Sequence, residues 1–117
     1  MATIDDVRLV ALSLPRTEER LVGERVKFRV GRLVYLSVSA DEQWLGFAFP
    51  REERAALIAA EPDRFHPPHR SDERYNWVRL WLPAVDAAEL RELIVDAWRM
   101  VVPKRVAAAH LDGPQDS

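Results

Sequence analysis

The feature of this sequence that most constrains its fold is a run of strands, at about 18–49, with no helix between them. Along one strand apolar and basic side chains alternate, with the period of two that is typical of one buried face. The two sets are Val26, Phe28 and Val30, and Arg25, Lys27 and Arg29. Strands joined by short turns pair in antiparallel fashion, whereas parallel strands need long crossover connections. The region therefore predicts one antiparallel sheet and argues against a doubly wound parallel sheet.

The turn after Val30 determines the register of the next strand, LVYLSVS at 33–39. A plain two-residue turn would place the charged Lys27 beside an apolar leucine. A three-residue loop, with the turn glycine in the left-handed conformation, would pair Val26 with Val34 and keep apolar beside apolar. We therefore expect a bulged hairpin in the second register, which places Tyr35 on the same face as the basic residues.

Helices are predicted before and after the strand run in the sequence. The clearest spans 87–102, where Asp86 as N-cap and Glu89 form a capping box. Its apolar side chains recur at helical spacing and form one continuous face: Leu90, Leu93, Ile94, Ala97, Trp98 and Val101. Shorter helices are expected at about 4–14, 50–60 and 104–111, and a further strand at 75–82. This order predicts an α+β fold in which helices pack on one face of a single antiparallel sheet.

Composition indicates one globular domain. The chain has 117 residues, of which 48% are hydrophobic and 31% charged, and we expect a domain at 1–111 followed by a polar tail at 112–117. The absence of cysteine excludes disulfides, thiolate catalysis and thiolate metal sites. No apolar run is long enough to span a bilayer, and the first residues, MATIDDVR, are acidic where a signal peptide is basic. We therefore expect a cytoplasmic protein without membrane contact.

The candidate binding residues lie on two strands that expose cations and aromatic rings. In the segment FHPPHRSDERYNWVRLWL at 65–82, tryptophan and arginine alternate with apolar residues along the expected strand. If both strands share a sheet whose other face is covered by helices, these side chains can contact phosphates and stack bases. The predicted nucleic-acid-binding set is Arg25, Lys27, Arg29, Arg32, Trp77, Arg79 and Trp81, with further charge from Lys104 and Arg105 after the long helix.

Three other interpretations of this face remain open. The arginines are also typical of a solvated sheet face, with the tryptophans covered by the loop at 61–74 or by the last helix. The same face could form a homodimer or bind another protein, or Trp44 and Tyr35 could help it hold a planar small molecule. Because the formal net charge is −2, DNA binding would depend on a local basic patch and be sensitive to salt.

No catalytic or metal-binding set is recognisable. His66 and His69 are separated by two prolines, and a zinc site would need further ligands such as Asp63 or Asp72. Adjacent carboxylates occur only where helix starts and turns favour them, and neither a nucleophile elbow nor a glycine-rich phosphate loop is present. We therefore predict a protein that is not an enzyme and that has no metal and no cofactor.

Several segments, in their order and spacing, carry a resemblance to a known family. They are ALSLPRTEE at 11–19, VKFRVGRLVYLS at 26–37, LGFAFPREERAALIAAEPDRF at 45–65, PPH at 67–69, YNWVRL at 75–80 and ELRELIVDAWRMVVPKR at 89–105. The chain resembles the YjbR/MmcQ family of small bacterial proteins. The resemblance implies a fold like that of the bacterial frataxin homologue, called a double wing, and a DNA-binding function, and it brings no catalytic residues. Many relatives have a second glycine and a lysine where this chain has Arg32 and Leu33, so the hairpin turn is expected to differ.

Overall fold

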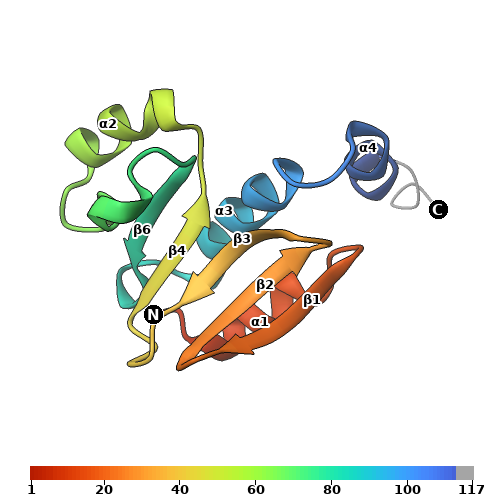
Figure 1. Ribbon diagram of the computed structural model, residues 1–117, viewed down its shortest axis with the longest axis horizontal. Coiled ribbons are helices and arrows are strands. Elements are labelled where there is room, and N and C mark those ends of the chain that lie inside the picture. The colour runs from red at the N-terminus through yellow and green to blue at the C-terminus, as the bar shows by residue number, and fades with distance from the viewer. Residues whose placement is uncertain (113–117) are drawn as a thin grey trace.

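Six strands form one antiparallel sheet in the order β1-β2-β3-β4-β6-β5 (Figure 1). The structure is a computed structural model that describes residues 1–112. The strands are β1 (Thr17–Val22), β2 (Arg25–Val30), β3 (Leu33–Val38), β4 (Trp44–Ala48), β5 (Phe65–His66) and β6 (Trp77–Trp81), and the α-helices are α1 (Ile4–Ala11), α2 (Arg51–Ala60), α3 (Ala87–Arg99) and α4 (Lys104–Asp112). Short 3₁₀ turns, η1 (Arg70–Asp72) and η2 (Leu82–Ala84), flank β6. The predicted α+β class with a single antiparallel sheet is confirmed.

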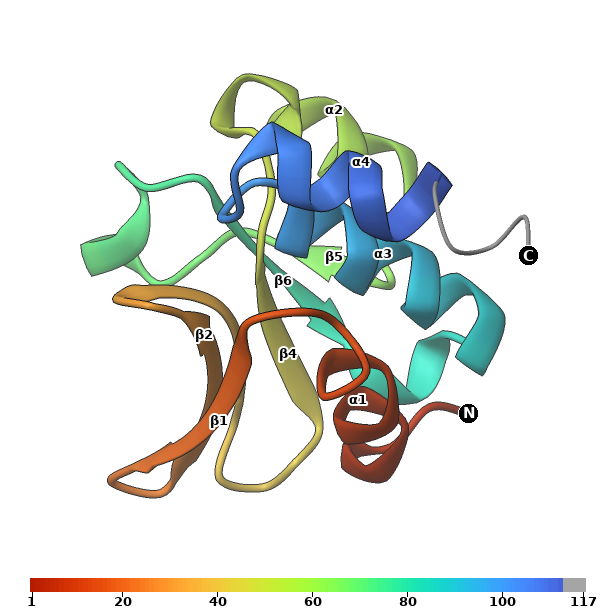
Figure 2. The same cartoon turned by 90° about the vertical axis from the view of Figure 1, so that its right-hand side faces the viewer.

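Helices α1 and α3 cover one face of the sheet, and the opposite face is curved and open (Figure 2). The apolar face of α3 is buried as its spacing predicts, at Leu90, Ile94, Ala97 and Trp98. The indole Nε1 of Trp98 donates a hydrogen bond to the carbonyl of Pro15 at 2.9 Å, so α3 is tied to the segment that follows α1. The open face and the edges of the sheet are therefore the parts of the sheet that α1 and α3 leave accessible.

The start of α3 differs in one detail from the prediction. The side chain of Asp86 accepts a hydrogen bond from the backbone N–H of Glu89 at 2.8 Å, as expected of an N-cap. The side chain of Glu89 does not complete a capping box but accepts two hydrogen bonds from Arg64, at 2.5 and 2.6 Å. A guanidinium forms stronger hydrogen bonds to a carboxylate than a neutral backbone N–H does, so this interaction joins α3 to the segment before β5.

The predicted register of the hairpin is wrong. Val30 pairs with Leu33 across a two-residue turn, and a bulge in β3 then shifts the register so that Val26 pairs with Val38 rather than with Val34. The turn glycine does have a positive φ of 59°. The prediction assigned the change of register to a longer loop. It arises instead within β3, where Tyr35 is an extra residue without a partner in β2.

Tyr35 is therefore not on the open face. It lies at the bulge and is completely buried on the helix-covered side. Its hydroxyl lies 2.7 Å from the Thr17 hydroxyl, and this hydrogen bond satisfies the polar atom that the burial of a tyrosine brings into a core. The expectation that Tyr35 joins the basic residues is wrong because the bulge reverses its side of the sheet.

The remaining boundaries are close to the predicted ones. Helix α1 ends at residue 11 rather than 14, α3 ends at residue 99 rather than 102, and the expected surface loop at 61–74 contains β5, which pairs with β6. Of the predicted tail, residue 112 ends α4, and residues 113–117 lie outside the described residues. Within the described part of the chain, no helix has the length and apolar character required to cross a membrane.

We expect Tyr35→Phe to lower the free energy of unfolding at neutral pH by about 1 kcal/mol, the typical net value of one hydrogen bond. Burial raises the pKa of Tyr35 to about 12, partly opposed by the hydrogen bond with Thr17. An unfolded tyrosine loses its proton near pH 10, so between about pH 10 and 12 the folded state binds more protons and stability falls as the pH rises. Urea unfolding at pH 9 and pH 11 should show a larger loss for the unmodified protein than for Tyr35→Phe. An equal loss in both proteins would contradict this assignment.

Candidate binding groove

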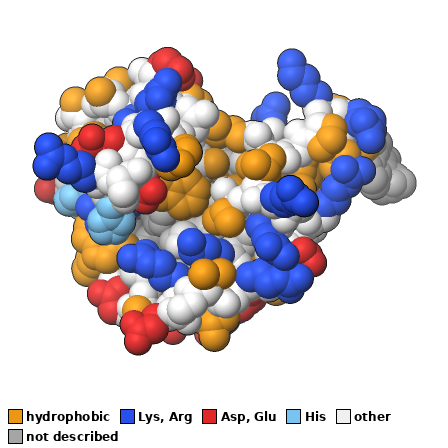
Figure 3. Space-filling view, in the orientation of Figure 1, with side chains coloured by type: hydrophobic (Ala, Val, Ile, Leu, Met, Phe, Trp, Pro, Cys, Tyr) orange, Lys and Arg blue, Asp and Glu red, His pale blue; other side chains and the backbone are white. Residues whose placement is uncertain are grey.

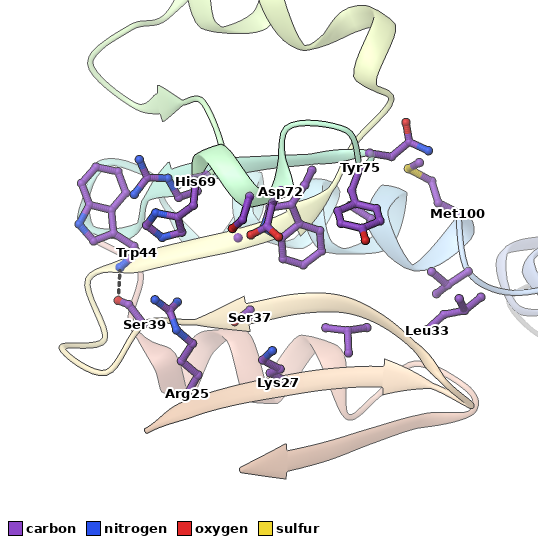
Figure 4. Close-up of a pocket in the computed structure, with 18 of the residues that line it drawn as sticks. Arg25, Lys27, Leu33, Ser37, Ser39, Trp44, His69, Asp72, Tyr75 and Met100 are labelled. Carbon is purple, nitrogen blue, oxygen red and sulfur yellow. Dashed lines mark hydrogen bonds between the residues drawn. The ribbon is translucent and has the colours of Figure 1, made fainter. Parts of the chain in front are cut away.

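The open face of the sheet carries a groove of about 870 Å³. One wall is formed by β2 and β3, which contribute Arg25, Lys27 and Ser37 (Figure 4). The opposite wall is the segment at 67–76, here called the roof loop, and it contributes His69, Ser71, Asp72, Tyr75 and Asn76. The floor is formed by β4 and β6, and Met100 lies at one end.

Trp77 forms part of the floor, because the facing strand has no side chain at Gly46. A Cβ atom added to Gly46 would lie 2.6 Å from the indole Nε1 and 2.9 Å from Cε2 of Trp77. The indole is therefore packed directly against the backbone of β4, which only glycine permits. Trp77 is half-buried and in contact with the core, so it is neither the fully exposed ring nor the covered ring that the sequence left open.

A second aromatic cluster is centred on Trp44 at the other end of the floor. The ring centroids of Trp81 and His66 each lie 4.9 Å from that of Trp44 in edge-to-face geometry. The guanidinium of Arg79 lies 5.2 Å from the Trp44 ring, and its Nε donates a hydrogen bond to the carbonyl of Pro67 at 2.8 Å. Arg79 therefore joins the floor to the roof loop, and Trp81 packs beside Trp44 outside the groove lining.

The turn before β4 holds Trp44 in place. Asp41 accepts a hydrogen bond from the Ser39 hydroxyl at 2.6 Å, and Ser39 Oγ accepts one from the backbone N–H of Trp44 at 3.0 Å (dashed in Figure 4). The hydrogen bond from Ser39 is the main cause of a lowered pKa at Asp41, with smaller contributions that include the charge of Arg25. Asp41 thus remains ionised and serves the turn rather than a ligand.

The predicted cations are divided between the groove and the rest of the surface. Arg25 and Lys27 line the groove, and basic side chains are visible along the hairpin on this face (Figure 3). Arg29 lies beside Glu18, with 3.6 Å between Nε and Oε1. Outside the groove lining are Arg32, exposed in the hairpin turn, and Lys104 and Arg105, exposed on α4.

Helix α2 fixes the roof loop through two arginines. The guanidinium of Arg54 donates hydrogen bonds to the carbonyls of Glu73, Tyr75 and Trp77, at 2.8, 3.2 and 2.9 Å. The guanidinium of Arg51 donates a hydrogen bond to the carbonyl of Arg74, which lies between two of these residues. The backbone N–H of Arg51 donates to the side chain of Asn76 at 3.0 Å. The groove is therefore preformed, with its roof tied to a helix.

Tyr75 and the role of Asp72 in the groove were missed in the sequence. Both lie in the charged segment between the histidines and β6, where no periodic pattern indicates which side chains turn inward. The only signal in the sequence is an aromatic residue, Tyr75, two positions before the Trp77–Trp81 strand. His66 packs against Trp44 and His69 lines the groove, and no group of three or more potential metal ligands occurs in the described part of the chain.

Comparison with known proteins gives the family context of this fold. A family model described as YjbR matches residues 12–100. The crystal structure of Deinococcus radiodurans protein DR2400, which has a DUF419 domain, superposes with a TM-score of 0.76 at 28% identity, covering 90% of this chain and 82% of that chain. None of the curated proteins matches the chain significantly.

We expect Gly46→Ala to displace the indole of Trp77 from the floor and to destabilise the protein by about 1–3 kcal/mol, as overpacking does. The indole N–H resonance of Trp77, assigned with a Trp77→Phe variant, should move much further than that of Trp98, which lies on the other side of the sheet. A spectrum in which neither resonance moves would show that the floor does not depend on this glycine.

Proposed function

The chain belongs to the YjbR family, and we propose that it binds single-stranded DNA in the groove without chemical conversion. The observation that carries this proposal is the half-buried indole of Trp77 on the groove floor, facing a wall with two cations, Arg25 and Lys27. Aromatic rings beside a basic wall are the arrangement by which proteins stack unpaired bases and contact the backbone.

The size of the groove favours an unpaired strand over a duplex. Its volume of about 870 Å³ lies within the range of about 300–1,000 Å³ that is typical of small-molecule sites. A double helix keeps its base faces stacked inside, whereas an unpaired strand can insert a base onto an aromatic floor. Stacking of this kind contributes about 1–3 kcal/mol per base.

The two cations of the wall are available for phosphate contacts. Arg25 and Lys27 form no salt bridge with any residue in the described part of the chain, whereas Arg8, Arg29 and Arg64 each lie beside a carboxylate. Arg79 is engaged by Trp44 and the Pro67 carbonyl. We therefore count two phosphate contacts in the groove, fewer than the sequence alone indicated.

A planar small molecule is the second candidate ligand, because the volume and aromatic floor of the groove also fit such a compound. Homodimer formation, or binding of another protein, through the face that carries Trp77, Arg79 and Trp81 is less well supported. Trp77 and Trp81 are half-buried, and Trp77 lies on the groove floor between its two walls, so little of their surface is presented to a flat partner.

We expect a labelled strand of about six nucleotides, within the site size of about 4–16 nucleotides known for such grooves, to bind more tightly than its duplex. With two phosphate contacts and a slope of about −0.7 per contact for single strands, affinity should fall about sevenfold between 50 and 200 mM salt. Fluorescence polarisation measures both effects.

A double variant, Arg25→Ala with Lys27→Ala, should weaken binding and remove most of this salt dependence. The matched control is Lys104→Ala with Arg105→Ala, which removes the same charge from α4 and should leave binding nearly unchanged. The proposal fails if no strand binds at tens of micromolar protein, or if the control weakens binding as much as the groove variant.

A further inference from the structure

We propose that the groove selects guanine, and that Asp72 recognises this base through its N1–H and N2–H groups. The inference rests on the proposed function and adds a specificity-determining residue to it. It derives from the carboxylate of Asp72, which the fold places inside the groove opposite the wall that carries Arg25 and Lys27.

Asp72 is held rigidly with its carboxylate in the groove. Its backbone N–H donates to the carbonyl of His69 at 2.8 Å, and its own carbonyl accepts from the N–H of Tyr75 at 3.0 Å. The half-buried side chain projects from the roof loop towards the floor (Figure 4). Its carboxylate accepts no hydrogen bond and forms no ion pair with any residue in 1–110, in contrast to Asp41, which is satisfied by Ser39 and Gln43.

The charge of Asp72 determines which part of a nucleotide can lie beneath the roof loop. A carboxylate repels a phosphate, and the two available cations lie on the opposite wall. The backbone of a bound strand should therefore follow Arg25 and Lys27, with the base extended across Trp77 towards Asp72. In this orientation the floor contacts the face of the base, and the carboxylate meets its edge.

The chemistry of that edge distinguishes the four bases. An ionised carboxylate only accepts hydrogen bonds, and it binds most strongly when two donors lie side by side. Guanine presents two adjacent donors, N1–H and the N2 amino group. In cytosine and adenine the amino group lies beside a ring nitrogen that accepts, and in thymine the single N–H lies between two carbonyls. Only guanine offers Asp72 a pair of donors.

The test compares three strands of about six nucleotides, all thymine except for one central position occupied by guanine, inosine or thymine. Inosine retains N1–H but lacks the N2 amino group. A bidentate contact is worth about 1–3 kcal/mol of discrimination, so the guanine strand should bind about tenfold more tightly than the thymine strand. The inosine strand should lie between them.

Asp72→Asn retains the shape of the side chain but replaces one acceptor with a donor. This variant should bind the thymine strand at least as tightly as the unmodified protein does, because a negative charge is removed, and it should lose the preference for guanine. The matched control is Glu73→Gln, the same change at an exposed neighbour outside the groove lining, which should keep the preference.

The outcomes separate this inference from the proposed function. If no strand binds, both are overturned. If all three strands bind equally, or if Asp72→Asn keeps the guanine preference, the assignment of Asp72 is overturned while DNA binding in the groove stands. If Glu73→Gln loses the preference as Asp72→Asn does, the effect is one of net charge, and the assignment is again overturned.

Discussion

The contact between the Trp77 indole and the backbone at Gly46 determines the shape of the open face. Any side chain at this position would overlap the indole, because even a Cβ atom would lie 2.6 Å from Nε1. With the ring against β4, the space between the roof loop and the opposite wall of β2 and β3 remains open as a groove. Arg79, paired with Gly46 across the sheet, then extends to Pro67 and Trp44. The roof, the floor and the second aromatic cluster thus meet around one position without a side chain.

The rigidity of the groove has a separate origin in α2. Arg54 alone donates hydrogen bonds to the carbonyls of every second residue from Glu73 to Trp77, in the segment before and at the start of β6. Such charge-assisted hydrogen bonds are each worth about 1.5–3 kcal/mol in favourable cases. Because these groups are exposed or partly buried, the effective stabilisation is at the lower end of that range. The consequence for binding is preorganisation: a ligand that enters does not have to order the roof loop, and less of its interaction energy is lost.

Local periodicity accounts for what the sequence could predict. The alternation of Lys27 with Phe28 and of Trp77 with Val78 correctly assigns side chains to the two faces, and the caps of α1 and α3 are recognisable. The register of β3 was not predictable in this way, since the bulge brings Tyr35 to Thr17, which is 18 positions distant in the chain. The two-residue strand β5 is shorter than any periodic signal. Its place depends on pairing with β6.

For the groove, the same distinction separates the residues on strands from those of the roof loop. Arg25, Lys27 and Trp77 were identifiable because strands impose their orientation. Asp72 and Tyr75 were not, because their orientation depends on hydrogen bonds from α2, which lies about 20 residues earlier in the chain. Sequence patterns therefore indicated the cations and the indole of the groove but not the carboxylate that faces them.

The charge distribution indicates how such a groove can discriminate between ligands. In a chain with a formal net charge of −2, long-range attraction for a polyanion is weak, and four of the arginines, Arg8, Arg20, Arg29 and Arg64, lie beside carboxylates. Arg25 and Lys27, which form no salt bridge within the part of the chain that the structure describes, would supply few phosphate contacts in the proposed complex, and the facing carboxylate of Asp72 would reduce their attraction further. A surface of this kind gains little from binding any anion indiscriminately. Under the proposed function, affinity would depend on what fills the space between the walls, and a base stacked on Trp77 and donating to Asp72 would turn an unfavourable charge into a favourable contact.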